Sequence, residues 1–583
     1  MSMIVRCASL VLILQIGFSN AEIKDKGWWK RSIIYEIVPQ SYKDSNNDGY
    51  GDFKGIQQKL EYIKDLGIDT ILLRPIYPKS GDQQDDVTYY TDIHPKFGGM
   101  NDFENLIKDA KNRSMKVILD FIPNHMSTDS IWFQASMNKT PPKFADYFIW
   151  HNGTGEGGSK GEKGKEPNNW KAVGTKESAW IYNETREQWY LSQFGGNQAD
   201  LNYKSKEVLE DIDDALRFWL NKGVDGFRMD KISYIYENDD LKNENEKKEK
   251  PEHYDDYEHT RTMDDPRNHD LVARWRNLLD DWADQKNETE KILLIDANIT
   301  QAVTFYNNGS NIPINYNLTL LDSNSNPEDF KKAIENWNKE VPHGHVANWI
   351  TGDYNHHRIA SRFHDRDIVD KPRSDQITML TMILPGIAFT YYGEEIGMID
   401  KMDNCRSVFQ WTAEENAGFC SGSCSLNTSF APSDDFKNIN VAVEMKHNNS
   451  FLSHYQELVK LRHSSEILEN GTLSVHSSAN KTLVVVRQLK DKSIVLVMNF
   501  ENKNQTINVG TWIKDVSEVT VLMASKTYEG NLVPKTKLDP SKIELQIRGA
   551  LLLLTKSSGA LTMASSVLLI GCSLLSVFRV FNF

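Results

Sequence analysis

The stretch Lys116-Val117-Ile118-Leu119-Asp120-Phe121 decides the class of fold that this chain of 583 residues adopts. It is largely apolar along its whole length, as a β-strand must be when both faces of its sheet are covered. Strands of this kind occur in parallel sheets, where crossover helices cover both faces. The stretch therefore predicts an α/β protein.

The same pattern repeats before and after this strand. Short aliphatic or β-branched runs alternate with longer amphipathic stretches, of which 53–66 and 102–112 are predicted as helices. The other predicted strands of this part are 33–37, 70–73, 226–230, 292–296 and 388–392. Strand, polar loop and helix in repetition over about 440 residues favour a parallel (β/α)8 barrel, the TIM barrel.

Two stretches depart from this alternation. Residues 125–198 are rich in Gly, Lys, Trp and Asn, and we interpret them as a subdomain inserted after the third strand. Short strands and turns over 481–556 predict an antiparallel β-sandwich domain. The barrel then spans 22–480, and the charged segment 237–270 is interpreted as a solvated loop.

Both ends of the chain have the features of targeting signals. Residues 1–21 carry Arg6, an apolar run and small residues before Glu22, which predicts a cleaved secretory signal. Small residues followed by a spacer and an apolar tail are typical of a GPI-attachment signal, here 557–583, with Ser557 or Ser558 as the attachment site. A membrane-spanning tail is the less favoured alternative.

Composition and modification sites point to the secretory pathway. Thirteen Asn-x-Ser/Thr sequons accompany the signal peptide. Cys7 and Cys572 leave with the processed ends, after which Cys420 and Cys424 could close a small loop while Cys405 could stay free. A hydrophobic content of 39% excludes a mainly disordered chain, and a net charge of -14 argues against nucleic acid as a partner. We expect a GPI-anchored glycoprotein at the extracellular face of the plasma membrane.

Polar residues stand at or just after several predicted strands. They are Asp120, Asn124, His125, Arg228, Asp230, Asp296, Asn355 and Arg358. In a barrel of this type the carboxyl ends of the strands form the active face, so these side chains should converge. One such Asp alone would more often be a helix cap, but their recurrence favours a functional site.

Four segments resemble the signature regions of glycoside hydrolase family 13, and within it those of the insect maltases (α-glucosidases). They are DFIPNH at 120–125, QADLN at 198–202, GFRMD at 226–230 and YYGEEIGM at 391–398. The resemblance covers about residues 28–555. It implies retaining hydrolysis of α-glucosides such as maltose or sucrose, in which two carboxyl groups about 5 to 5.5 Å apart act as nucleophile and acid.

Part of this machinery has its counterpart in the chain. The resemblance assigns the nucleophile to Asp230, which Arg228 would keep ionised. His125, Asp86 and Arg358 match positions that bind the sugar in the first subsite. These residues alone would favour an active enzyme.

Other positions depart from the maltase pattern. Asp296 replaces the acid/base Glu, and its shorter side chain withdraws the carboxyl by about 1.5 Å. A catalytic group misplaced by about 1 Å can already lower the rate about 10²-fold. Asn355 replaces the carboxylate that stabilises the transition state. Asp85 aligns with a Tyr that stacks under the sugar, and the residue after the nucleophile is Lys231, a cation that could pair with Asp230.

We therefore predict a maltase-like surface glycoprotein whose hydrolysis is lost or strongly reduced, and which binds a sugar, a protein partner or a toxin. An active α-glucosidase or sucrase is the alternative. A homodimer is compatible with either function. The sequon at Asn298 raises a related hypothesis, because a glycan there would sit at the mouth of the barrel; an unused sequon is equally compatible with the sequence.

A separate motif, Asp44-Ser-Asn46-Asn-Asp48-Gly-Tyr50-Gly-Asp52, alternates oxygen-bearing side chains around a glycine turn. Such a set suits a hard cation. A similar loop of the maltases binds Ca²⁺, which implies a structural Ca²⁺ held by Asp44, Asn46, Asp48, the Tyr50 carbonyl and Asp52. A metal-free turn rich in Asp and Asn is the alternative.

Overall fold

The computed structural model describes most of the chain between its two predicted targeting signals. The described ranges are 23–81, 85–154, 163–363, 372–402, 404–422, 424–426, 430–478, 481–528 and 532–557. The predicted signal peptide, 1–21, lies outside them, and of the predicted GPI-attachment signal, 557–583, only Ser557 is described. Within these ranges no helix has both the length and the apolar character that a membrane crossing requires.

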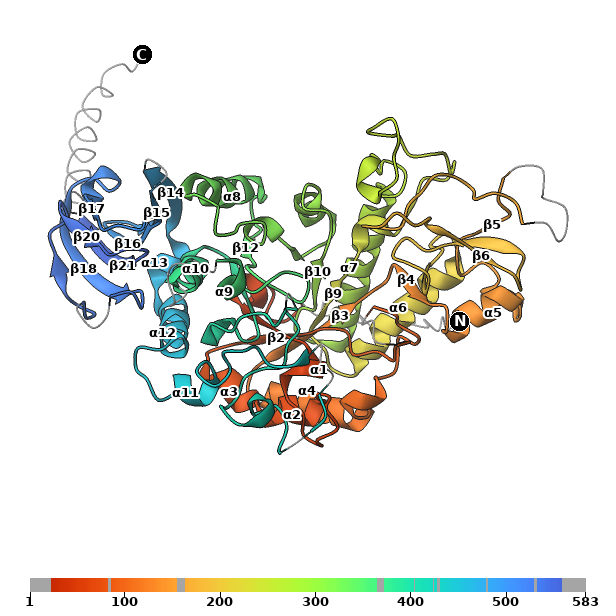
Figure 1. Cartoon of the computed structure of the whole chain (residues 1–583), viewed down its shortest axis with the longest axis horizontal. Helices are drawn as coiled ribbons and strands as arrows, with labels where there is room; N and C mark the ends of the chain where they lie inside the picture. The colour runs from red at the N-terminus through yellow and green to blue at the C-terminus, as the bar shows by residue number, and fades with distance from the viewer. Residues whose placement is uncertain are drawn as a thin grey trace, which may run out of the picture.

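Eight parallel strands form a near-barrel sheet in the middle of the molecule (Figure 1). Their order is β11-β10-β9-β3-β2-β1-β13-β12. The bounds are β1 Ile33–Ile37, β2 Thr70–Leu73, β3 Lys116–Phe121, β9 Gly226–Met229, β10 Ile292–Ile295, β11 Ile312–Pro313, β12 Asn348–Trp349 and β13 Ile387–Tyr391. The predicted TIM barrel is confirmed, and each predicted strand of it coincides with an observed one.

The seam between β11 and β12 is bridged by side chains. Asn348 donates from Nδ2 to the Pro313 carbonyl at 2.7 Å, and Asn315 donates from Nδ2 to the Asn348 carbonyl at 3.1 Å. The Asn315 amide in turn donates to Asn348 Oδ1 at 2.9 Å. Both side chains are fully buried, so these bonds satisfy polar groups that water does not reach.

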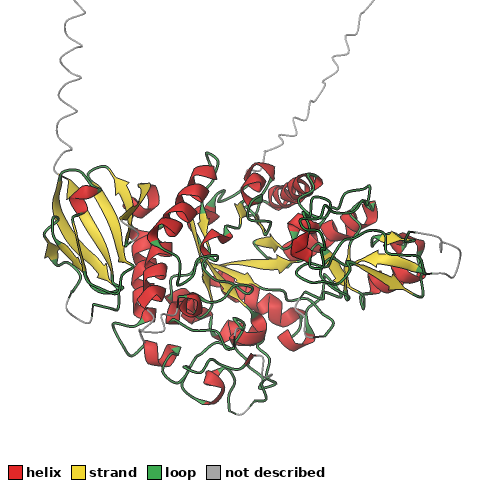
Figure 2. Ribbon diagram, turned by 45° about the horizontal axis from the view of Figure 1, so that its top comes forward, coloured by secondary structure: helices red, strands yellow, loops and turns green. Residues whose placement is uncertain are grey.

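Helices surround the sheet and complete the barrel (Figure 2). They are α1 Pro39–Tyr42, α2 Phe53–Gln58, α3 Leu60–Asp65, α4 Met100–Asn112, α6 Lys206–Asn221, α7 Arg267–Lys286, α8 Pro327–Glu340, α9 Ile359–Arg362, α10 Pro372–Ile383, α11 Val441–Glu444, α12 Phe451–Ser464 and α13 Glu466–Asn470. The single helix predicted over 53–66 is wrong in one respect, since it divides into α2 and α3 at Lys59. The Lys59 N–H bonds to the carbonyls of Ile56 and Gln57, a tight turn that ends α2.

The strands bury side chains on both faces, as their apolar sequences require. In β3, Ile118 belongs to a cluster that fills the barrel, with Leu72 and Leu294 among its other members. Val117 and Leu119 belong to the larger cluster between the sheet and the helices. This alternation follows from the two-residue period of a strand.

The described part of the inserted segment forms two small sheets, β5-β7-β6 and β4-β8, and an α-helix beside the barrel, opposite the C-terminal domain (Figure 1). It contains β4 His125–Ser127, α5 Ile131–Asn138, β5 Trp150–His151, β6 Trp180–Asn183, β7 Gln188–Leu191 and β8 Gln198–Asp200. Strand β4 pairs with β8, so the segment leaves the barrel and returns to it through one antiparallel ladder. Trp170, Trp180 and Trp189 form its own core.

The C-terminal domain is antiparallel, as predicted. Its six-stranded sheet has the order β14-β15-β16-β21-β18-β19, and a second sheet pairs β17 with β20. The bounds are β14 Thr472–Ser478, β15 Thr482–Leu489, β16 Lys492–Asn499, β17 Gln505–Ile507, β18 Val516–Ala524, β19 Lys537–Leu538, β20 Ile543–Leu545 and β21 Ala550–Ser557. Apolar side chains of both sheets share one core.

Candidate active site

Four charged side chains meet at the carboxyl ends of β3, β9 and β10. The Arg228 guanidinium donates to Asp120 Oδ1 at 2.7 Å, lies 3.4 Å from Asp230 Oδ2 and also donates to Asp296. Arg228 and Asp120 are almost wholly buried. A buried cation surrounded by three carboxylates is stable only because all of these charges are paired.

The side chain that follows Asp230 changes the electrostatics of the site. Lys231 Nζ lies 3.1 Å from Asp85 Oδ2 and 3.9 Å from Asp230 Oδ2. Burial alone would raise the pKa of Asp230, but the Lys231 ammonium and the Arg228 guanidinium hold that pKa well below its usual range. Asp230 is therefore a carboxylate throughout the physiological pH range, with a cation beside it.

The Asp296 carboxyl is held against the wall of the barrel. Its Oδ2 accepts from Arg228 and, at 3.0 Å, from the Tyr316 hydroxyl. Burial raises the pKa of Asp296 to about 7, and the Asp230 carboxylate adds to this rise while Arg228 opposes it. Asp230 and Asp296 thus differ strongly in their affinity for a proton.

Asn355 lies at the rim of the site. Its side chain is exposed, and its Oδ1 accepts from the Arg406 guanidinium at 3.2 Å. Arg406 lies 3.7 Å from the centre of the Tyr354 ring, so this cation covers the residue before Asn355. Next to it, Asp353 accepts from His356 Nδ1 at 2.7 Å. Burial opposes both charges, but this contact lowers the pKa of Asp353 to about 2 and raises that of His356.

The structure places His125 beside the Asp85–Lys231 pair. His125 is fully buried; its Nδ1 bonds to Asn124 Oδ1 at 2.9 Å and its Nε2 to the Asp85 carbonyl at 3.2 Å. Burial, aided by Lys231, lowers the pKa of His125 to about 4. Both ring nitrogens therefore face protein oxygen atoms, and the neutral imidazole that the lowered pKa favours can donate to only one of them.

The remaining two predicted sugar contacts, Asp86 and Arg358, have partners within the protein. Asp86 accepts from Gln198 Nε2 at 2.6 Å and lines a neighbouring cavity of about 380 Å³. Arg358 is fully buried and donates to the carbonyls of Tyr392 and Cys405. The structure therefore gives Asp86 and Arg358 protein partners of their own, and their predicted contacts with a sugar stay a prediction.

A cavity of about 370 Å³ opens over this constellation. Among the residues that line it are Phe194, Asp230, Lys231, Asp296, Tyr316 and Asn355. Convergent polar groups with perturbed pKa values in one cavity mark a functional site. We take this cavity as the candidate active site.

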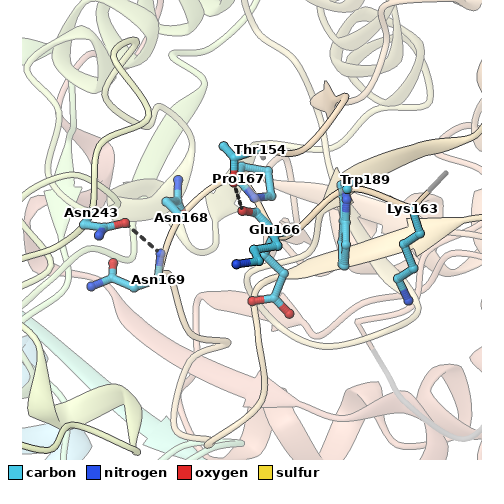
Figure 3. Close-up of a pocket in the computed structure, with 10 residues that line it drawn as sticks. Thr154, Lys163, Glu166, Pro167, Asn168, Asn169, Trp189 and Asn243 are labelled. Atoms are coloured by element: carbon cyan, nitrogen blue, oxygen red, sulfur yellow. Dashed lines mark hydrogen bonds between the residues drawn. The ribbon is translucent and has the colours of Figure 1, made fainter. Parts of the chain in front are cut away.

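A larger cavity, of about 790 Å³, lies in the inserted subdomain and holds none of the predicted site residues (Figure 3). Trp189 and Asn168 line it. Asn168 already accepts from Trp180 Nε1 at 2.8 Å and donates to the Leu241 carbonyl at 3.0 Å. Because these bonds hold Asn168 within the subdomain core, its amide serves packing rather than a ligand.

Comparison with known proteins fits this geometry. A model of the alpha-amylase catalytic domain matches residues 36–471. The chain belongs to the alpha-amylase family. Maltase 1 of Drosophila virilis is 33% identical in an alignment 567 positions long, which covers 91% of this chain and 87% of that protein. The alpha-glucosidase of Apis mellifera is 34% identical in an alignment 512 positions long, which covers 82% of this chain and 86% of that protein.

Two further proteins are similar to this chain, one in sequence and one in fold. The human amino acid transporter heavy chain SLC3A1 is 34% identical in an alignment 524 positions long, which covers 85% of this chain and 74% of that protein. The crystal structure of isomaltulose synthase from Erwinia rhapontici has the same fold, with a TM-score of 0.78 at 24% identity over 91% of this chain and 99% of that chain. The fold alone therefore does not specify the activity.

The loop that the family resemblance assigns to Ca²⁺ follows α1. Its donors are all oxygen atoms, which suits Ca²⁺. In the structure Asp44 Oδ2 accepts from the Gly49 amide at 2.9 Å, Asp48 Oδ2 pairs with Lys96 Nζ at 2.9 Å, and Asp52 accepts from Ser45. The chemistry of the set therefore fits the ion, which would compete with Lys96 for Asp48.

The cysteines of this family member resolve one alternative that the sequence left open. Cys420 and Cys424 form a disulfide, and Cys405 is a buried free thiol. The disulfide loop lies against the predicted Ca²⁺ loop, where the Ser421 amide donates to Asn47 Oδ1 at 2.8 Å. The disulfide thus constrains the segment 420–424, which contacts the predicted Ca²⁺ loop.

Several residues of the site were not predicted. Tyr316 and His356 line the cavity, and Arg406 covers Tyr354. Tyr316 and His356 follow the two-residue strands β11 and β12, which are too short for any periodic signal. Their position after strands of an alpha-amylase barrel is the feature that could have identified them.

Proposed function

We propose that this chain is a maltase-like glycoprotein whose hydrolysis of α-glucosides is lost or strongly reduced, and that it acts by binding. The observation that carries the proposal is the Lys231 ammonium, 3.9 Å from the Asp230 carboxylate and 3.1 Å from Asp85. A nucleophile that is already paired with a buried cation must lose part of that attraction before it attacks carbon.

The acid position supports the same proposal. Proton donation requires the carboxyl to reach the glycosidic oxygen, yet Asp296 is one methylene shorter than Glu and is held by Arg228 and Tyr316. The neutral Asn355 offers no negative charge to an oxocarbenium-like centre. Its contact with Arg406 places a cation there instead.

Binding then remains as the function of the site and its surroundings. The relatives comprise maltases and an amino acid transporter heavy chain, so not every relative is named for hydrolysis. We propose a sugar, a protein ligand or a toxin as the bound molecule. We further propose a GPI anchor at the extracellular face of the plasma membrane, which release by a phosphatidylinositol-specific phospholipase would test, and a structural Ca²⁺ at Asp44, Asn46, Asp48, Tyr50 and Asp52.

Hydrolysis assays on the full chain expressed in insect cells test the central proposal. The wild type is compared with Asp296→Glu/Asn355→Asp on maltose, sucrose and an activated aryl α-glucoside. The aryl substrate needs little acid assistance, so it reports on the nucleophile separately. We expect no turnover of the disaccharides by the wild type and measurable turnover by the variant. Disaccharide turnover by the wild type would refute the proposal.

One observation favours the alternative, an active α-glucosidase. Asp230 is ionised while Asp296 has a pKa of about 7. Two carboxyl groups whose pKa values differ in this way are what a retaining hydrolase uses as nucleophile and acid. If the wild type is active, its rate should fall as Asp296 loses its proton above about pH 7.

A further inference from the structure

We propose that Asn298 carries an N-linked glycan whose first sugars occupy the candidate active-site cavity. Asn298-Ile299-Thr300 is an acceptor sequon. Asn298 and Ile299 line the same cavity of about 370 Å³ as Asp230 and Asp296. The proposal rests on the proposed function, because a chain that turned over sugars would need this cavity open.

The sequon follows the strand that carries the acid position. Strand β10 ends at Ile295, so Asn298 stands only two residues beyond Asp296. Its backbone amide donates to Ser233 Oγ at 2.8 Å, which fixes it against the loop that follows Asp230. A sugar attached here therefore starts from the wall of the cavity rather than from a distant surface.

The local hydrogen bonds are compatible with the modification. Asn298 Nδ2 donates to Asp264 Oδ2 at 3.1 Å, and Asn298 Oδ1 accepts from the amide and the hydroxyl of Thr300, both at 3.2 Å. A glycosylated amide nitrogen keeps one hydrogen, so it can still donate to Asp264. Asn298 is half-buried and Thr300 is exposed, so solvent reaches the sequon.

The covalent step has ordinary secretory chemistry. The donor is a lipid-linked diphosphate oligosaccharide, whose bond between the sugar C1 and phosphate breaks as the C1–Nδ2 bond forms. The diphosphate leaves with the electron pair, and the displaced hydrogen of Asn298 leaves as a proton. No oxidant or reductant takes part.

A tethered sugar does not need high affinity to fill the cavity. A short tether gives the attached sugar an effective concentration of about 1 mM at the cavity, so weak contacts suffice to keep it there. Phe194, Tyr234 and Tyr316 line the cavity and offer aromatic surface to a sugar ring. The glycan would then compete with free saccharides for the space beside Asp230, so that only saccharides at high concentration would enter.

Mass spectrometry of the full chain, secreted from insect cells, tests the attachment. Thr300→Ala removes the sequon but keeps Asn298, and Thr300→Ser is the matched control because it keeps the sequon. We expect the wild type and Thr300→Ser to exceed Thr300→Ala by the mass of one glycan. Release of the glycan in ¹⁸O-water should label residue 298 in the first two proteins. If the masses of the wild type, Thr300→Ser and Thr300→Ala differ only by the residue at position 300, and residue 298 carries no ¹⁸O label, the proposal is overturned.

Hydrogen–deuterium exchange tests where the sugars lie. The amides of residues 230–236, which border the cavity, should exchange several-fold more slowly in Thr300→Ser than in Thr300→Ala. Equal exchange in the two variants would place the glycan in solvent and refute occupancy of the cavity. Neither readout depends on hydrolysis, so the outcome is independent of whether the proposed loss of activity holds.

Discussion

Removal of the Lys231 ammonium should release the Asp230 carboxylate for attack. Lys231 Nζ lies 3.9 Å from Asp230 Oδ2. For unit charges at this distance and an effective dielectric constant of about 20, the attraction is about 4 kcal/mol. Since about 1.4 kcal/mol changes a rate tenfold, loss of this attraction from the ground state alone gives up to about 10³-fold.

The variant must not leave a second carboxylate unpaired. Lys231 is closer to Asp85 than to Asp230, so Lys231→Ala alone would leave the Asp85 carboxylate without its cation beside Asp230, which keeps Arg228 as a partner. We therefore combine Lys231→Ala with Asp85→Asn, in the Asp296→Glu/Asn355→Asp background. The matched control is Asp85→Asn in the same background, where the ammonium keeps Asp230 as its partner.

Turnover of an activated aryl α-glucoside measures the effect. We expect the variant without Lys231 to be about 10²- to 10³-fold faster than its control. Because Lys231 helps to hold the pKa of Asp230 below its usual range, its removal should raise that pKa and move the acid limb of kcat/KM to higher pH. A folded variant with neither the faster turnover nor the displaced limb would refute the role given to Lys231.

Three further predictions concern stability. Burial raises the pKa of Glu394 to about 7, so the stability that its protonated form contributes is complete below its ordinary pKa and is lost as the pH rises to about 7. Glu394→Gln should therefore reduce the fall of Tm with pH, measured by calorimetry. The same fall of Tm with pH in the variant and the wild type would contradict this prediction. Cys420→Ala/Cys424→Ala opens a loop of four-residue separation and should lower the free energy of unfolding by about 2 kcal/mol in urea, whereas an unchanged midpoint would argue against it. If the predicted loop holds Ca²⁺, a chelator should lower the Tm of the wild type more than that of Asp48→Asn, and an unaffected wild type would exclude the ion.

Most of the barrel could be predicted from the sequence because its longer strands are buried on both faces. The apolar runs at 116–121 and 292–296 coincide with β3 and β10 for this reason. Strands β11 and β12 could not be predicted, since two residues show no period. Their seam depends on the amides of Asn315 and Asn348, which a reading of hydrophobic runs does not detect.

The candidate site was predictable where chemistry follows a strand directly, and less so where partners come from distant loops. Asp230 and Asp296 meet because β9 and β10 are neighbours in register. The pairing of Lys231 with Asp230 could be anticipated from adjacency. Its closer contact with Asp85 could not, because a loop after another strand supplies that carboxylate.

The positions that distinguish this pocket come directly after the last paired residues of the barrel strands. The ladder between β9 and β10 ends at the pair Met229 and Ile295, and Asp230 and Asp296 are the next residues. Side chains beyond the ladder contribute little to the pairing of the strands, while the apolar residues within it supply the core. Lys231 can therefore change the charge at the nucleophile without disturbing the fold. For the same reason, substitutions that restore the pocket should leave the barrel folded, so that a failure to recover activity would reflect the chemistry of the site rather than loss of structure.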